Sequence, residues 1–229
     1  MFFDAFDSIR ILNLPHRADR RREMRHELKR LGIADDRRVS FFEASRAEGL
    51  GGFSSKNVHG CFASHLRLLE EAAKAGERVL VLEDDCDFAP AARIYELPPE
   101  WDIFYGGYLA DTPDDLDNSN VIGAHCMGYS PRAVKRLAAY LRNLLEDPNF
   151  TPDPKAAADS DFDPRIKPPF DGAIVWFRRA NVDLKTVFAQ IAVQRSSRSD
   201  IADGSFLDRT LPSAAALARK VKNRLRRWR

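Results

Sequence analysis

The chain has 229 residues, of which 44% are hydrophobic and 31% charged, enough for one domain with its own core, or one domain and a tail. Its formal net charge is only +2, from 36 basic and 34 acidic residues. The body of the chain therefore lacks the broad basic excess of nucleic-acid-binding domains, and no nucleic-acid partner is expected.

The cysteines and the N-terminal segment indicate a reducing compartment. Cys61, Cys86 and Cys126 are widely spaced and form no CxxC pair, so a zinc knuckle or a redox pair is not predicted. We interpret all three as small core residues. Residues 1–10 have no basic start typical of a secretion signal, and no apolar run approaches the roughly 20 residues of a membrane span. These features predict a cytoplasmic protein.

The first half of the chain alternates between strand and helix patterns. The apolar spacing predicts strands at 9–14, 38–43 and 79–83, with helices at 19–31 and 60–75 between them. This β-α-β-α-β order favours a parallel sheet with right-handed crossovers.

The second half is less regular. A helix is predicted from about Ser130, with Pro131 in its first position, to about residue 145. Residues 146–170 are rich in Pro and Asp and are interpreted as a long loop. Further strands are predicted at 101–106, 121–129, 173–177 and 187–193.

Four carboxylates follow directly after the apolar run at 79–82. They are Glu83, Asp84, Asp85 and Asp87. Alternation along a strand would point Asp84 one way and the other three the opposite way. Three carboxylates on one side repel one another unless a cation compensates, and Mg²⁺ or Mn²⁺ is the simplest cation. An inert, solvated acidic turn is the alternative interpretation.

Other polar residues are expected near the same edge of the sheet. Arg17 and Arg20 follow the first predicted strand, where Arg forks suit a diphosphate; exposed first-turn residues are the alternative. Ser64 and His65 are expected in the first turns of the second helix, where phosphate is attracted, although His65 also suits a core position. His125 is a further candidate for contact with metal or phosphate.

Four segments, in order and spacing, resemble the motifs of glycosyltransferase family 25. These are Asn13 to Arg20, Gly60 to His65 (GCFASH), Leu82 to Asp85 (LEDD), and Ala124 to Ser130 before a helix. The resemblance covers residues 9 to about 200. It implies a GT-A-like nucleotide-sugar-binding fold with a mostly parallel central sheet flanked by helices.

The resemblance also implies an activity. Members transfer a sugar, often galactose from UDP-galactose, to lipopolysaccharide or lipooligosaccharide in bacteria, or to hydroxylysine in collagen-modifying relatives. The chain has no counterpart of the extra domains of the collagen enzymes, which favours the bacterial branch. We therefore expect an inverting galactosyltransferase that depends on a divalent metal, with Mn²⁺ favoured over Mg²⁺.

Each candidate residue is assigned a role in the expected transfer reaction. Asp85 is the first metal ligand, assisted by Glu83 or Asp87 and His125. Asp171 is the candidate general base, because its late position is similar to that of an Asp in the family and direct displacement needs a carboxylate; a helix cap or turn residue is the alternative. The nucleotide-sugar is expected to meet Asn13, Leu14, Arg17, Arg20, Ser64, His65 and Asp84.

Two other classes of protein remain open. One is a catalytically inactive nucleotide-sugar-binding module. The other is a Mg²⁺-dependent phosphoryl-transfer enzyme or nuclease, since carboxylate clusters serve those reactions too. The absence of a GxxxxGK[ST] motif argues against an NTPase.

The last residues differ in composition from the rest. We divide the chain into a catalytic domain at 1–205 and a basic amphipathic tail at 206–229. Within 212–229, Leu217, Val221, Leu225 and Trp228 recur on one helical face, and residues 219–229 carry seven basic side chains and no acid. This pattern is typical of helices that bind an anionic membrane surface. It predicts a peripheral protein at the inner face of the membrane, with a lipid-linked oligosaccharide as acceptor.

The tail hypothesis predicts a difference in vesicle binding. The full chain should co-sediment with anionic vesicles at low salt and detach at high salt, because each basic residue contributes about 1 kcal/mol near such a surface. A chain that ends at Leu211 should not co-sediment. Equal and weak binding of the two chains would exclude the tail as an anchor.

Overall fold

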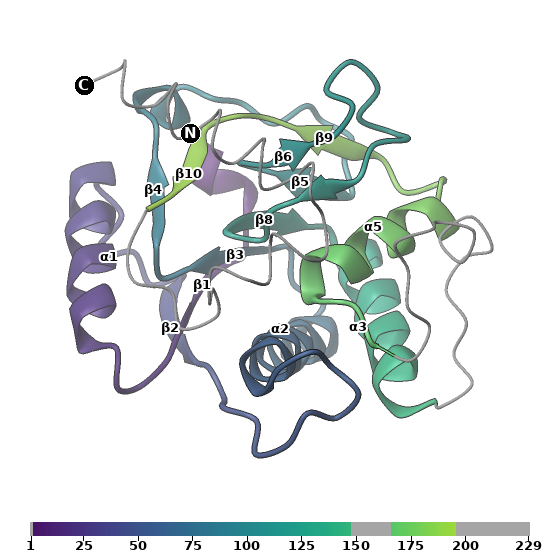
Figure 1. Ribbon diagram of the computed structural model, residues 1–229. Coiled ribbons are helices and arrows are strands. Elements are labelled where there is room, and N and C mark those ends of the chain that lie inside the picture. Colours follow the sequence, from purple (N-terminus) through teal and green to yellow (C-terminus); the bar gives the residue numbers. More distant parts are fainter. Residues whose placement is uncertain (1, 148–165, 196–229) are drawn as a thin grey trace.

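A mixed six-stranded sheet forms the centre of the computed structural model, which describes residues 2–147 and 166–195 (Figure 1). Its spatial order is β2-β1-β3-β8-β5-β9. Because β8 pairs antiparallel with β3 and β5 while the other ladders are parallel, only β8 runs against the rest. The strands are β1 (Ser8–Asn13), β2 (Val39–Glu43), β3 (Val79–Glu83), β5 (Ile103–Tyr105), β8 (Cys126–Tyr129) and β9 (Thr186–Phe188).

Helices and two small ladders complete the described fold. The α-helices are α1 (Ala18–Leu31), α2 (Lys56–Ala75), α3 (Pro131–Glu146) and α5 (Phe170–Ala180). The 3-10 helices are η1 (Phe2–Ala5) and η2 (Pro90–Arg93). The ladders pair β4 (Cys86–Phe88) with β10 (Ala192–Gln194), and β6 (Leu109–Ala110) with β7 (Val121–Ile122).

The inner strand β3 is buried on both faces, so it needs apolar side chains at successive positions. Along β3, Val79 and Val81 pack into the core under α2, α3 and α5, whereas Leu80 and Leu82 pack into the core under η1, α1 and β4 (Figure 1). The continuous apolar run at 79–82 is the sequence signature of such a strand.

Side-chain caps and glycines set the helix ends. Ser55 accepts a hydrogen bond from the backbone N–H of Val58 (3.2 Å) at the start of α2, and Ser130 caps α3 in the same way. Gly32 and Gly76 end α1 and α2 in the left-handed conformation, with φ of 80° and 66°, which glycine adopts at little cost.

The fold class predicted from the sequence is confirmed. The structure is α/β, with a mostly parallel central sheet flanked by helices. The first strand, the 19–31 helix, the 38–43 strand, the 79–83 strand, the 101–106 strand and the 130–145 helix all occur within three residues of their predicted ends.

Three predictions of secondary structure are wrong. The predicted strand at 173–177 belongs to helix α5, where Phe170, Ala173, Ile174 and Phe177 are buried at helical spacing. The predicted strand at 121–129 divides into β7 and β8 around Gly123, whose φ is +119°. The predicted strand at 187–193 divides into β9 and β10.

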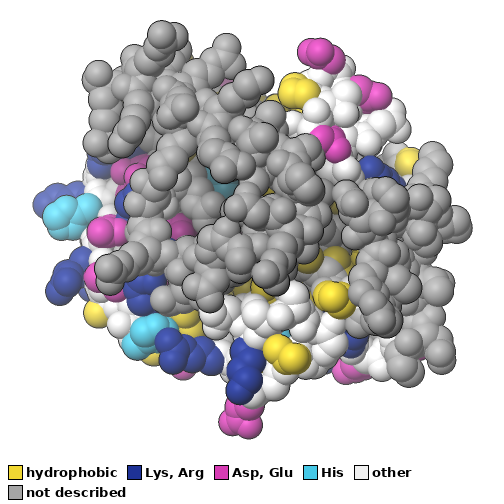
Figure 2. All heavy atoms as spheres, viewed as in Figure 1, with side chains coloured by type: hydrophobic (Ala, Val, Ile, Leu, Met, Phe, Trp, Pro, Cys, Tyr) yellow, Lys and Arg dark blue, Asp and Glu magenta, His cyan; other side chains and the backbone are white. Residues whose placement is uncertain are grey.

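Several sequence predictions fall on residues outside the described ranges, including most of the 146–170 loop and the whole 206–229 tail. Among the helices of residues 2–147 and 166–195, none is long and apolar enough to cross a membrane. Basic side chains are visible along the left and lower edges of Figure 2, and α1 exposes Arg21, Arg22, Arg25 and Lys29.

Candidate functional site

The polar residues predicted from the sequence converge on one edge of the sheet. The parallel strands β1, β2 and β3 end there, and in such sheets ligands bind at the carboxyl ends. Because β8 is antiparallel, its first residues lie at that edge too. Asn13, Glu43, Glu83 and His125 are thereby brought to one side of the molecule.

Asp84 is held by one residue from β1 and one from α1. Its carboxylate accepts a hydrogen bond from Asn13 Nδ2 (2.7 Å) and one from Arg20 Nη1 (2.8 Å). Asn13 Nδ2 also donates to the carbonyl of Arg17 (3.2 Å). Two of the motif segments, at 13–20 and 82–85, are therefore bound to each other through Asp84.

Glu83 and Asp85 form the centre of the carboxylate cluster. Both accept long contacts from the side-chain amide of Gln194 (3.5 and 3.4 Å), and Asp85 also lies 3.1 Å from Arg20 Nη1. Burial raises the pKa of Glu83 to about 7, and burial together with the charge of Glu83 does the same for the pKa of Asp85. When Glu83 and Asp85 are both ionised, they and Asp84 carry more negative charge than the one Arg20 guanidinium can balance.

Asp87 belongs to a different environment. The chain turns at Asp84 and Asp85, so the alternation expected for one continuous strand does not extend to β4. Asp87 accepts hydrogen bonds from Arg195 (Nη2 at 2.6 Å), whose Nη1 also pairs with Glu23. The expected grouping of Asp87 with Glu83 and Asp85 is therefore interrupted by this ion pair.

His125 lies beside Glu83, as the interpretation of a metal-proximal residue requires. Its carbonyl accepts the backbone N–H of Glu83 (3.0 Å), and its side chain is buried. Burial lowers the pKa of His125, while the charge of Glu83 and a hydrogen bond with the Ala192 backbone act in the opposite direction. Gly107 makes room for this ring, since a Cβ there would lie 2.4 Å from Nε2.

Ser64 and His65 do not lie in the first turns of their helix, so that prediction is wrong. Helix α2 begins at Lys56, and both residues lie in its third turn. Ser64 Oγ donates to the carbonyl of Gly60 (2.6 Å) and accepts the backbone N–H of Ser45 (2.9 Å). A Cβ on Gly60 would lie 2.8 Å from the Ser45 carbonyl, so these two motif residues fix α2 against the segment after β2.

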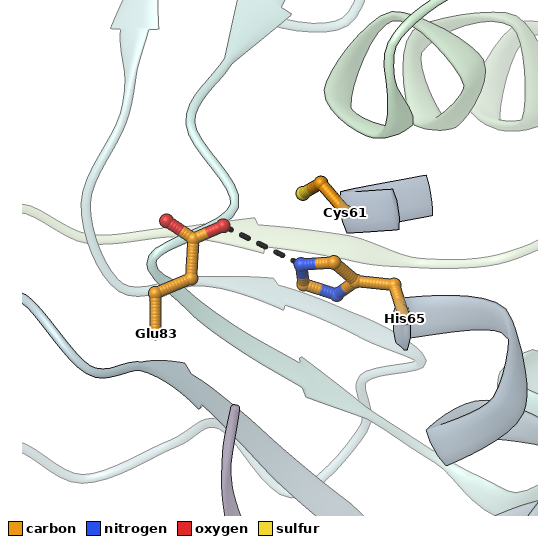
Figure 3. Close-up of side chains that lie close together, drawn as sticks. All are labelled: Cys61, His65 and Glu83. Atoms are coloured by element: carbon orange, nitrogen blue, oxygen red, sulfur yellow. Dashed lines mark hydrogen bonds and ion pairs between the residues drawn. The ribbon is translucent and has the colours of Figure 1, made fainter. Parts of the chain in front are cut away.

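His65 faces the carboxylates from the middle of α2. Its ring stacks on Phe170, with centroids 3.8 Å apart and planes at 14°, and its Nε2 lies 3.4 Å from Glu83 Oε1. Burial lowers the pKa of His65 to about 3, so the imidazole is neutral at pH 7. Cys61, one turn earlier, faces the same space and is more than the core residue we expected (Figure 3). Cys61, His65 and Glu83 could together hold a metal ion.

Asp171 joins this cluster from α5. It lies in the first turn of that helix, where its carboxylate accepts the N–H of Gly172 (2.9 Å). Burial raises the pKa of Asp171, and its charge raises the pKa of Glu83 and of Cys61. The structure thus brings the candidate base to the candidate metal ligands. The alternative role of a helix cap is not seen, because the N-cap residue of α5 is Pro169 and no side-chain cap hydrogen bond forms there.

An open hollow of about 350 Å³ lies beside the cluster, at the ends of β1 and β2. Leu14, predicted to meet the nucleotide, is one of its walls; the full lining is Leu14, Pro15, His16, Glu43, Ala44, Ser45 and Arg46. Arg17 is mostly buried and pairs with Asp19 (2.9 Å).

Sequence reasoning missed Gln194, Arg195 and Phe170. Gln194 and Arg195 reach the carboxylates through the β4–β10 ladder. This ladder joins residues more than 100 positions apart, and no local sequence pattern predicts such a pairing. Phe170 begins an apolar helical face that the sequence contains, but we interpreted 173–177 as a strand and therefore did not recognise that face.

Comparison with known proteins gives structural likenesses but no sequence match. No family model matches the chain, and no curated protein matches it. A solved structure described as a glycosyltransferase involved in the glycosylation of the major capsid of PBCV-1 is similar over 80% of this chain and 82% of that one, with 15% identity and a TM-score of 0.43. A likeness of this degree assigns no activity, which has to come from the site residues.

The raised pKa values predict a pH-dependent stability without metal. The folded chain keeps protons on Glu83 and Asp85 up to about pH 7, whereas the unfolded chain loses them near pH 4. Stability from this pair is therefore present at low pH and lost as the pH rises through about 7. In the presence of a metal chelator, the unfolding temperature of the Asp85→Asn variant should fall less between pH 5 and pH 8 than that of the parent.

The comparison of the parent with Asp85→Asn isolates the contribution of Asp85. His65 and His125, with lowered pKa values, act in the opposite direction below about pH 6.5 in both proteins, so their contribution cancels. About 1 kcal/mol corresponds to roughly 2–4 °C for a chain of this size. Parallel pH profiles for the parent and the variant would contradict the raised pKa of Asp85.

Proposed function

We propose that this chain is a metal-dependent glycosyltransferase that moves a sugar from a nucleotide-sugar donor to a saccharide acceptor. The observation that carries the proposal is the meeting, at one carboxyl edge, of Asn13 and Arg20 with the half-buried Glu83, the buried Asp85 and Asp171. An anion-binding guanidinium, candidate metal ligands and a candidate base are the groups that this transfer needs.

The carboxylates fit a divalent ion. Glu83 and Asp85 offer hard oxygen ligands with too little positive charge around them, and the buried imidazole of His125 lies near Glu83. Mn²⁺ accepts this combination of oxygen and imidazole nitrogen, and Mg²⁺ accepts the oxygens. When bound, the ion would offset the charge of the donor diphosphate. Asp87 would have to leave Arg195 to take part.

The chain's own residues have separate tasks in this proposal. The hollow beside Leu14 has room for part of a nucleoside next to the cluster. Arg20 orients Asp84 and Asp85. Asp171, whose pKa is raised by burial, accepts the proton of the acceptor hydroxyl as that oxygen attacks the anomeric carbon. Attack from the face opposite the leaving group gives inversion.

The identity of donor and acceptor comes from the sequence motifs alone. The resemblance to glycosyltransferase family 25 favours UDP-galactose as donor and lipopolysaccharide or lipooligosaccharide as acceptor. A lipid-linked acceptor agrees with a membrane-binding tail at 212–229. Inversion, metal dependence and these substrates are parts of the same proposal, and the measurements below test it.

Loss of Asp85 should remove metal-dependent nucleotide binding. Asp85→Asn keeps the side-chain size but removes a charged ligand, so the Mn²⁺-dependent gain in UDP affinity should fall by more than about tenfold. Titration calorimetry with and without Mn²⁺ measures this gain. Asp87→Asn is the matched comparison, because Arg195 already holds Asp87, and it should keep most of the gain. Unchanged Mn²⁺ dependence in Asp85→Asn would exclude Asp85 as a ligand.

Loss of Asp171 should slow the chemical step without loss of donor binding. Asp171→Asn can still accept the Gly172 N–H but cannot take a proton, so turnover should drop by about 10²–10⁴. Sugar transfer from UDP-galactose and UDP affinity are measured on the same preparation. Activity within a few-fold of the parent would place the base elsewhere. A parent chain that binds UDP but transfers nothing would be a binding module, and release of phosphate without an acceptor would indicate phosphoryl transfer.

A further inference from the structure

A thiol, an imidazole and a carboxylate meet between α2 and the end of β3. They belong to Cys61, His65 and Glu83, and their candidate ligand atoms all lie within 4.8 Å of one another (Figure 3). We propose that these three side chains form a site for a thiophilic divalent cation of the Zn²⁺ type, different in ligand chemistry from the oxygen-rich Mn²⁺ site proposed above.

The helix supplies two of the ligands by spacing alone. Cys61 and His65 are four residues apart in α2, and side chains at i and i+4 lie on the same helix face. Glu83 is the last residue of β3, so its position is fixed by the central sheet. Two rigid elements therefore hold the three groups toward a common point, as a metal site requires.

The distance between the imidazole and the carboxylate suits a bridging metal better than a hydrogen bond. His65 Nε2 and Glu83 Oε1 lie 3.4 Å apart, long for a direct hydrogen bond to nitrogen. Two ligands at about 2.1 Å from a tetrahedral Zn²⁺ lie about 3.4 Å from each other. The pair is thus already spaced as one edge of such a tetrahedron, and the thiol sulfur lies within 4.8 Å of both atoms.

The imidazole is also prepared for a metal. Stacking on Phe170 fixes the plane of the His65 ring, with Nε2 directed toward Glu83. The ring is nearly inaccessible to water, with 1% of the residue exposed. Phe170 here takes the orienting role that a hydrogen-bonding group has at most metal-bound histidines.

The ligand set selects the class of cation. Sulfur and imidazole ligands favour Zn²⁺ and similar ions, whereas Mg²⁺ and Mn²⁺ prefer oxygen. On binding, the S–H bond of Cys61 breaks, the thiolate sulfur forms a bond to the cation, and the proton leaves to solvent. Three protein ligands leave a fourth position for water or another small ligand.

Glu83 belongs to both sites, which has a consequence if the proposed function is correct. A Zn²⁺ ion that occupies Glu83 together with Cys61 and His65 withdraws this carboxylate from Asp85 and from the Mn²⁺ position. Zn²⁺ should then inhibit the transferase, and Cys61→Ser should relieve the inhibition. This consequence rests on the proposed function, whereas the site itself does not.

Cobalt binding to the full chain tests the site directly. Co²⁺ replaces Zn²⁺ and gives a sulfur-to-cobalt absorption band only when a thiolate is bound. The metal-stripped parent should show this band on titration with Co²⁺, and added Zn²⁺ should abolish it. Cys61→Ser, a near-isosteric change, should remove the band, and His65→Gln should weaken Co²⁺ binding by more than about tenfold.

Cys86→Ala is the matched control, because Cys86 is a buried thiol outside the proposed site. It should keep the band, and circular dichroism should show all variants folded. A band that is absent from the parent, or that persists in Cys61→Ser, would overturn the proposal. The experiment contains no nucleotide or sugar, so its outcome is independent of the transferase activity.

Discussion

The carboxylate of Asp84 joins three parts of the chain on which the site depends. Through Asn13 and Arg20 it connects the end of β1, the first turn of α1 and the turn after β3. Asp84 is almost fully buried, and a buried carboxylate without partners would cost several kcal/mol. Each of the three segments is therefore held in place by the need to satisfy the same charge, and the positions of Glu83 and Asp85 follow from it.

Arg20 also limits how the cluster can be occupied. Its Nη1 lies between Asp84 and Asp85, so one guanidinium serves two carboxylates, and Glu83 receives only long contacts from the Gln194 amide and from His65 Nε2. The cluster can balance its charge by keeping protons or by binding a cation. Retained protons correspond to the raised pKa values of Glu83 and Asp85, and a bound cation would give the site its proposed chemistry. Protons and a metal thus compete for the same carboxylates.

The sequence predicted the sheet edge well because its signals are local. The apolar run of β3, the caps of α3 and the residues that follow β1 identify their elements without any partner, and strand direction places their ends together. Prediction failed where distant contacts decide. The Gln194 contact needs the β4–β10 ladder, and the position of Ser64 needs the longer α2. Cys61 was taken for a core residue because its neighbour Glu83 lies 22 positions away in the sequence.

The reversed direction of β8 affects which part of the chain is free to vary. A parallel strand in that place would require a crossover over one face of the sheet, with a helix packed into the core. Because β8 is antiparallel to β5, the chain between them only turns back at the ligand edge, through the β6–β7 ladder and a loop organised by Asp111. Changes of length in the largely exposed loop at 111–118 cost little loop entropy, whereas Ala110 and Val121 on either side of it belong to the core. The loop at 111–118 is therefore the part of this edge whose length can change while the sheet and its two cores stay the same.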